Sequence, residues 1–356
     1  MKKMFLMFLL CGATLLNASA QEKVYQIDEV SVINYGDGRL LFRQQNGEKT
    51  PLQGEHRIID GYHSEYLIAN FKNGMFDGLY RHFRRNMLIE ESTYKNGNLD
   101  GYRKTFYADG KTLERESTFI DGKINGIIKS YYQNGQVETE VSYKMGVQDG
   151  PDRRYSEDGE LLLDTYYKDG LPYGHWVEHI TSNRGDYICR RSFKNGKMTG
   201  EYSEIWKSGK PREKGTYKDG KKEGVWTKYR DDGTPSVSTT YKADEKTGEE
   251  KHYFTNGKVE TSRNFLNGKR DGISREYYSN GKLKLERTYK ANKEEGPYKR
   301  FYEDGTLREE GRCENDTEVY RKEYYDNGKL KAVAERPNGS GSWTTLERYD
   351  RNENKQ

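Results

Sequence analysis

The chain has 356 residues, of which 33% are charged and 32% hydrophobic, and 61 basic residues nearly balance 57 acidic ones. The two signs are interspersed, so the sequence lacks the clustered positive charge that nucleic-acid binding requires. After residue 20 no stretch is long and apolar enough to cross a membrane. Composition therefore argues against a nucleic-acid-binding protein and against a transmembrane segment in the mature chain.

Residues 1–20 have the pattern of a secretory signal peptide. Two lysines open the segment, residues 4–16 form an uncharged apolar run, and Ala18, Ser19 and Ala20 are the small residues that suit a cleavage site. Such a segment is too short and wrongly flanked for a membrane anchor. The sequence therefore predicts export to the periplasm, the outer-membrane surface or the extracellular space, with cleavage after Ala20.

Two segments flank a central repeated region. Residues 21–60 predict irregular strands that form an N-terminal cap, and this cap would cover a sheet edge that otherwise invites pairing with other chains. Residues 61–332 carry the repeats. Residues 333–356 end in a charged run and predict a C-terminal cap and tail.

Between the caps one pattern returns about every 24 residues: an aromatic residue, a basic residue, a tight turn, and then glycine and a short aromatic strand. Seven of the ten intervals between successive anchor residues are 24 residues long. A fixed period of this length marks a repeat architecture. The anchors are Phe71, Tyr94, Phe119, Tyr143, Tyr167, Phe193, Tyr217, Tyr241, Phe265 and Tyr289, with Cys313 in the eleventh position.

Residues 272–295 form the clearest unit. Leu283, Leu285 and Tyr289 alternate with polar residues, and a period of two marks a half-buried strand. The preceding Asn280-Gly281 pair tolerates positive φ at both central positions of a hairpin turn. Helix signals are nearly absent. We therefore predict an all-β fold, an elongated array of about eleven antiparallel β-hairpin repeats that forms a coiled meander or solenoid.

These motifs resemble the MORN-repeat family, in particular its bacterial variant, which is often labelled antitoxin-like. The matching segments are Phe193–Gly200, Phe265–Gly272 and Tyr277–Leu283, and the resemblance extends over about residues 60–332. The resemblance implies an elongated hairpin array that acts as a protein-assembly module, with membrane-lipid binding in some members. The chain is similar to an exported member of this family, whereas an antitoxin-like role would require that the protein stay inside the cell.

No group of residues in the sequence points to catalysis or to a metal. His175 and His179 are four residues apart, which on a strand separates them by about 13 Å, beyond a shared coordination shell. Adjacent glutamates such as Glu294 and Glu295 face opposite ways on a strand and cannot form an acid–base pair. We expect a non-enzymatic protein with no cofactor and no metal.

Two cysteines, Cys189 and Cys313, remain after cleavage. They lie five repeats apart, which in a rigid stack is on the order of 50 Å. A disulfide requires α-carbons within about 7 Å of each other. We therefore expect no intramolecular disulfide.

The first strand of each unit often carries two neighbouring aromatic residues. Adjacent strand residues face opposite ways, so one ring of each pair is expected to pack inside and the other to emerge. Two interpretations stay open: both rings cover a thin sheet, or the emergent rings form a ladder that docks a protein strand or a sugar chain. The candidate binding residues are Tyr107, Tyr132, Phe254, Tyr278, Tyr302 and Tyr325.

The leading hypothesis for function is an exported, non-enzymatic repeat scaffold that mediates protein–protein interaction in the cell envelope. One alternative is binding of cell-wall carbohydrate or peptidoglycan through the tyrosine ladder. Further alternatives are an antitoxin-like binder and a lipid-surface binder, and the latter would need a basic face. A protein partner is expected, a cell-wall glycan is the second choice, and nucleic acid is not expected.

Overall fold

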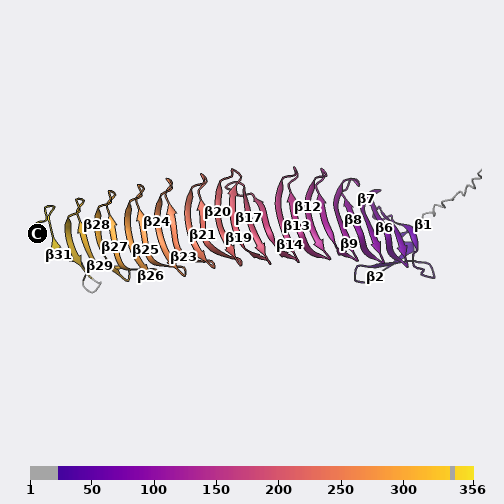
Figure 1. Ribbon diagram of the computed structural model, residues 1–356. Coiled ribbons are helices and arrows are strands. Elements are labelled where there is room, and N and C mark those ends of the chain that lie inside the picture. The colour runs from indigo at the N-terminus through magenta and orange to yellow at the C-terminus, as the bar shows by residue number, and fades with distance from the viewer. Residues whose placement is uncertain (1–22, 337–340) are drawn as a thin grey trace, which may run out of the picture. The chain divides into compact units, whose positions relative to one another are not determined.

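The computed structural model describes residues 23–336 and 341–356, which fall into two compact units divided between Gly135 and Gln136. The predicted signal peptide, residues 1–20, lies outside the described residues. Apart from one 3-10 turn, the regular elements are β-strands, and the described part of the chain contains no α-helix. Within each unit, successive strands pair as an open antiparallel meander (Figure 1). The predicted all-β meander is thus confirmed.

The first unit opens with short strands and continues with the first repeated hairpins. Its elements are β1 (Lys23–Gln26), η1 (Ile27–Glu29), β2 (Val30–Asn34), β3 (Leu40–Gln44), β4 (Gly54–Asp60), β5 (Glu65–Lys72), β6 (Met75–Arg84), β7 (Met87–Lys95), β8 (Asn98–Phe106), β9 (Leu113–Ile120), β10 (Lys123–Ile124) and β11 (Gly126–Tyr131). β1 pairs in parallel with β4, and β2 pairs with β3. From β4 to β9 each strand pairs antiparallel with the next, and β10 and β11 both pair with β9.

The second unit is a continuous succession of hairpins. Its strands are β12 (Val137–Lys144), β13 (Val147–Tyr155), β14 (Leu161–Lys168), β15 (Leu171–Pro172), β16 (Gly174–Ile180), β17 (Tyr187–Lys194), β18 (Lys197–Met198), β19 (Gly200–Trp206), β20 (Pro211–Lys218), β21 (Lys221–Tyr229), β22 (Pro235–Lys242), β23 (Glu245–Tyr253), β24 (Val259–Leu266), β25 (Lys269–Tyr277), β26 (Leu283–Lys290), β27 (Lys293–Phe301), β28 (Leu307–Glu314), β29 (Thr317–Tyr324), β30 (Leu330–Glu335) and β31 (Thr344–Arg348). β30 pairs with β31, so the sheet continues through the segment for which the sequence predicts a C-terminal cap.

Ten of the eleven anchor residues stand in register opposite a glycine of the preceding strand. Tyr289, for example, is paired with Gly272, and Tyr241 with Gly224. Both glycines have positive φ, +96° and +71°. A left-handed backbone favours glycine because a Cβ atom is strained there. The recurring glycine of the sequence pattern is therefore a requirement of the backbone at this position of the hairpin.

The turns that follow the anchors bond each repeat to the one before it. The amide of the turn glycine donates to a backbone carbonyl of the preceding turn, as Gly220 does to Met198 (2.8 Å). Three turns lack this glycine, and there Asp244, Asn292 and Asp316 adopt φ values of +75°, +77° and +68°. Their amides make the same inter-repeat bond. Asparagine and aspartate tolerate this conformation better than other residues with side chains.

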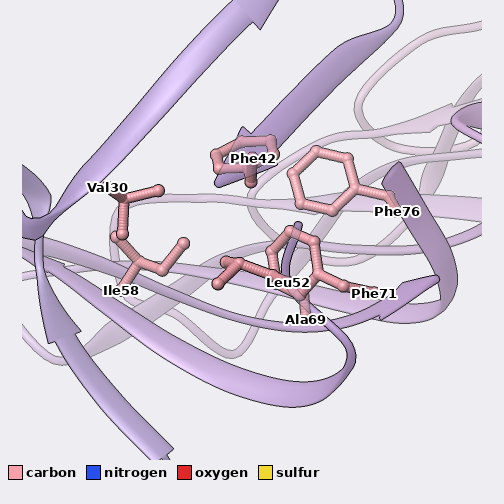
Figure 2. Packing of buried hydrophobic residues seen from close by; sticks show 7 residues of the cluster. All are labelled: Val30, Phe42, Leu52, Ile58, Ala69, Phe71 and Phe76. Carbon is pink, nitrogen blue, oxygen red and sulfur yellow. The ribbon is translucent and has the colours of Figure 1, made fainter. Parts of the chain in front are cut away.

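An apolar core lies in the first unit, where the β2–β3 hairpin packs on the sheet. Figure 2 shows the Phe42 ring facing Phe71 and Phe76, with ring centroids 5.2 and 4.9 Å from that of Phe42. The remaining buried members of the cluster are Val30, Leu52, Ile58 and Ala69. The hairpin is fixed to the sheet by the amide of Phe42, which donates to the carbonyl of Gly74 (2.7 Å). This packing places the first hairpin over the start of the repeats.

Candidate binding surfaces

The six predicted binding residues stand at the edge of the repeats where loops such as residues 278–282 join the strands, and we call this edge the loop edge. At the opposite edge, the tight-turn edge, the strands are joined by turns such as residues 267–268. Each one directly follows the last residue of a strand: Tyr107 follows β8, Tyr132 follows β11, Phe254 follows β23, Tyr278 follows β25, Tyr302 follows β27 and Tyr325 follows β29. All six side chains are half-buried. The alternation rule that predicted an emergent second ring does not apply to them, because they lie beyond the strand.

The hydroxyls of four of these tyrosines link neighbouring repeats. Tyr278 donates to the carbonyl of Phe301 (2.8 Å), and Tyr325 donates to that of Tyr349 (3.0 Å). Tyr107 and Tyr302 make the equivalent bonds to the carbonyls of Tyr131 and Tyr324. In every case the acceptor lies 22 to 24 residues further along the chain. These side chains therefore tie one hairpin to the next, and their binding of a partner stays a prediction.

Two repeats differ from the others at the loop edge. Arg230, in the position after β21, donates through its guanidinium to the carbonyl of Tyr253, which is the bond that tyrosine makes elsewhere. Phe254 has no hydroxyl, and in its loop the Asn256 side chain donates to a different carbonyl of the next repeat, that of Ser279 (2.9 Å). A residue of different chemistry, Arg230, thus keeps the inter-repeat bond.

One face of the second unit, which we call the packed face, carries the anchors and a row of buried carboxylates. Glu309 accepts hydrogen bonds from the Tyr298 hydroxyl (2.6 Å) and the Arg300 guanidinium (2.7 Å). Glu204 accepts a bond from the Tyr202 hydroxyl (2.6 Å) and one from Arg212. Buried charges are stable only when paired and hydrogen-bonded. These acids therefore organise the packing between strands.

The packed face is hollowed around Glu250. The hollow measures about 320 Å³ and is lined by Trp226, Tyr241, Lys246, His252 and Arg263 among others. Burial would raise the pKa of the Glu250 carboxyl, but the Lys246 ammonium and the side chains of His252 and Thr239 more than offset it and hold that pKa below its ordinary value. Glu250 is therefore ionised at neutral pH and engaged by its neighbours.

The two histidines that the sequence singled out are separated in their contacts. His175 faces Asp164 (3.7 Å), whereas His179 faces Glu160 (3.5 Å). His179 lines a second hollow of about 290 Å³ beside the irregular turn that follows β16. Among residues 23–336 and 341–356, no group of three potential metal ligands comes together.

Both cysteines lie free and buried in the second unit. Cys313 is paired in register with Gly296, as an anchor of the packed face.

In the part of the chain that is described, no helix has the length and apolar character needed to cross a membrane.

A cluster of exposed apolar side chains lies around β14 and β15, and we call it the aromatic patch. It consists of Val147, Tyr166, Leu171 and Tyr173, whose exposed fractions are 48%, 38%, 52% and 37%. Tyr166 directly precedes the anchor Tyr167 on the strand, so it points to the face opposite the packed face. In five of the six later repeats the position of Val147 and Leu171 holds a charged residue, and in the sixth it holds Thr317. The charged residues are Lys197, Lys221, Glu245, Lys269 and Lys293.

The search for recurring residues in the sequence did not find this patch. The patch is recognised by the opposite feature of the sequence. It consists of positions at which one stretch of the chain holds residues that differ from those of the other repeats. Aligning the units position by position reveals the departures at Val147, Tyr166, Leu171 and Tyr173.

Six segments of the chain match the family model of the MORN repeat variant: residues 124–145, 198–219, 246–267, 270–291, 294–312 and 318–335. Each segment from residue 246 onward covers one hairpin, and residues 270–291, for example, span most of β25 and all of β26. No protein of curated function matches the chain. The repeated unit read from the sequence is thus the unit that the family model recognises.

Proposed function

Because six segments of the chain match the MORN repeat variant, we propose that it is a non-enzymatic, exported scaffold whose repeats bind another protein in the cell envelope. The observation that carries this proposal is the aromatic patch. Exposed apolar side chains that gather in one place mark sites of interaction with other molecules. In most other repeats the same positions hold charged or polar residues, so the repeat fold itself does not require these apolar side chains.

The tyrosine ladder supports a sugar-binding role less well. At least four of its six residues donate their hydroxyls to backbone carbonyls of the next repeat. A hydroxyl that is already paired offers less to the hydroxyls of a sugar chain. The ladder therefore supports the stacking of hairpins, and the protein-binding proposal depends on the patch instead.

The proposal is tested by photocrosslinking in living cells. The full chain, signal segment included, is produced with the photoreactive residue p-benzoylphenylalanine in place of Leu171. The matched control carries it in place of Ile273, which is also exposed but lies on a regular repeat. We expect a reproducible protein adduct from position 171 in the envelope fraction and none from position 273. Absence of any protein adduct at position 171, or retention of the chain in the cytoplasm, would contradict the proposal.

A further inference from the structure

The first departure within the aromatic patch is at Tyr166. The residue before each anchor is serine, threonine or asparagine in nine of eleven repeats, namely Asn70, Thr93, Thr118, Ser142, Ser192, Thr216, Thr240, Asn264 and Thr288. Several of these side chains donate to a backbone carbonyl of the paired strand, as Thr240 does to Glu249 (3.0 Å). Tyr166 replaces this small polar side chain with an exposed ring. The ring is therefore not a requirement of the hairpin.

The second departure is at Tyr173, in the position before the glycine that opens a strand. In six other repeats this position holds an acid whose carboxylate accepts the amide of the following turn: Asp77, Asp100, Asp149, Glu223, Asp271 and Glu295. Tyr173 has no carboxylate that could accept the amide of the following turn. One stabilising contact has therefore been exchanged for a second exposed ring beside the first.

The two rings lie against each other, with centroids 6.3 Å apart and planes inclined by 57°. Together with Asp149, Lys168 and His175 they line an open hollow of about 360 Å³, which we call the slot. Leu171 is the register partner of Lys168, so the apolar surface continues from the slot toward the turn.

The polar groups around the slot are already engaged within the chain. Asp149 accepts the amide of Asp169 (3.0 Å), His175 faces Asp164, and the Lys168 ammonium stands 5.5 Å from the centroid of the Tyr173 ring. A sugar would need free groups to satisfy its many hydroxyls. The hydroxyls of Tyr166 and Tyr173 have no hydrogen-bond partner among the described residues, so they can donate to the carbonyls of a peptide backbone.

Charge indicates what flanks such a peptide. The tight-turn edge of three successive repeats, residues 144–149, 168–173 and 194–199, contains four lysines and two aspartates. Lys144, Lys168 and Lys194 are all exposed. A partner segment with acidic residues beside its apolar part is therefore complementary to this edge, and a basic one is repelled.

We infer that the slot lined by Tyr166 and Tyr173 binds an extended, proline-containing segment of the partner protein, flanked by acidic residues. This inference rests on the proposed function. A polyproline II helix has no internal hydrogen bonds and presents solvated carbonyls, and it docks in aromatic-lined grooves because it is already ordered before binding. Two inclined tyrosines with free hydroxyls offer both the groove and the donors.

The test uses two substitutions that restore the repeat pattern, Tyr166→Thr and Tyr173→Asp, in one chain. Since both residues are native to these positions in other repeats, the variant is expected to fold as the wild type does. Tyr62→Ser is the matched control, because Tyr62 is a 94% exposed ring in the first unit. Isothermal titration calorimetry then measures binding of an oligoproline peptide flanked by aspartates, the same peptide flanked by lysines, and a peptidoglycan-derived oligosaccharide.

We expect the aspartate-flanked peptide to bind the wild type and the Tyr62→Ser control equally, and the double variant at least about tenfold more weakly, as for loss of an aromatic hot spot. Equal or tighter binding of the lysine-flanked peptide would overturn the inference. The inference would also be overturned if only the oligosaccharide bound the wild type and the double variant no longer bound it. A third outcome combines this test with the photocrosslinking experiment. If no peptide binds, while the protein adduct from position 171 forms both in the wild type and in the double variant, the inference fails and the proposed function stands. If the adduct is absent from cells but the peptide binds, the proposed function fails and the slot remains a peptide site.

Discussion

Asp244 and Lys222 exchange two hydrogen bonds across neighbouring repeats. The amide of Asp244 donates to the carbonyl of Lys222 (3.1 Å), and the amide of Lys222 donates to Oδ1 of Asp244 (2.7 Å). The same exchange joins Asn292 with Arg270, and Asp316 with Glu294. These are the turns that lack the usual glycine. The substituting side chain therefore adds a bond while its backbone keeps the left-handed conformation.

A series of substitutions at Asp244 separates the two contributions. Asp244→Ala removes the acceptor and strains the backbone at positive φ, so we expect a loss of about 1–3 kcal/mol in the free energy of unfolding. Asp244→Gly relieves the strain and should lose only about 1 kcal/mol, for the missing bond. Asp244→Asn should be nearly neutral. Urea unfolding measures the series, with the exposed Asp231→Ala as control, and an equal loss for Asn and Ala would show that the exchange contributes nothing.

The hairpin architecture could be predicted because each local signal is repeated many times. Gly272 opposite Tyr289 and the Asn280-Gly281 turn have equivalents in most units, so the period, the places of the turns and the strand pairing are all stated redundantly. The predicted geometry of this turn was wrong in one respect, because only Gly281 of the pair has positive φ (+94°). A pattern of this kind reports what all repeats share, which is the backbone of the hairpin.

The contacts between repeats could not be predicted in the same way. The role of Tyr278 depends on its distance from the carbonyl of Phe301, and one unit considered alone contains no sign of that partner. The aromatic patch could not be predicted for a different reason. Tyr166 and Tyr173 are exceptions to the period, and a repeated pattern reports only the residues that recur.

The tyrosine hydroxyls at the loop edge should each contribute to the stacking of repeats. We expect Tyr278→Phe and Tyr325→Phe each to lower the free energy of unfolding by about 0.5–1.5 kcal/mol, since each leaves a backbone carbonyl without its donor. Phe254→Tyr is the reverse change, and we expect it to raise stability because the new hydroxyl can bond the next repeat. Thermal unfolding of the three variants measures this. A stabilising Tyr278→Phe, or a neutral result for all three, would show that the hydroxyls do not join the hairpins.

His56 should make the first unit sensitive to acid. Its side chain is buried, its Nε2 lies 2.9 Å from the carbonyl of Gln53, and burial lowers the pKa of its imidazole below the ordinary value. The folded state therefore resists protonation more than the unfolded chain does. The stability that His56 contributes is fully present above about pH 6.5 and declines as the pH falls from there toward the lowered pKa.

We therefore expect amide exchange in β4 and β5 to accelerate, after correction for the intrinsic rate, as the pH falls from about 7 to about 5. His56→Gln, which cannot be protonated, should remove most of this dependence. His63→Gln is the matched control, because His63 is exposed and the Asp60 carboxylate raises its pKa, so its contribution has the opposite sign. An unchanged pH dependence in His56→Gln would assign the effect to other groups.

The two cysteines should be inert in the folded protein. Burial raises the pKa of the Cys189 thiol, and burial together with the Glu294 carboxylate raises the pKa of Cys313 to about 12. Because the thiolate is the nucleophile, both side chains should resist iodoacetamide near pH 8 for as long as the fold persists. In denaturant without reductant both should be alkylated, since no disulfide joins them.

Mass spectrometry before and after denaturation counts the modified thiols. Ser208→Cys places a third thiol in an exposed turn and is the control, because it should react at once in the folded chain. Rapid modification of Cys313 in the native state would mean that its strand opens readily, which the packed face around Tyr298 and Glu294 should prevent. Failure of both native cysteines to react even when unfolded would instead indicate a disulfide, which a stack with five repeats between the two positions cannot form without folding back on itself.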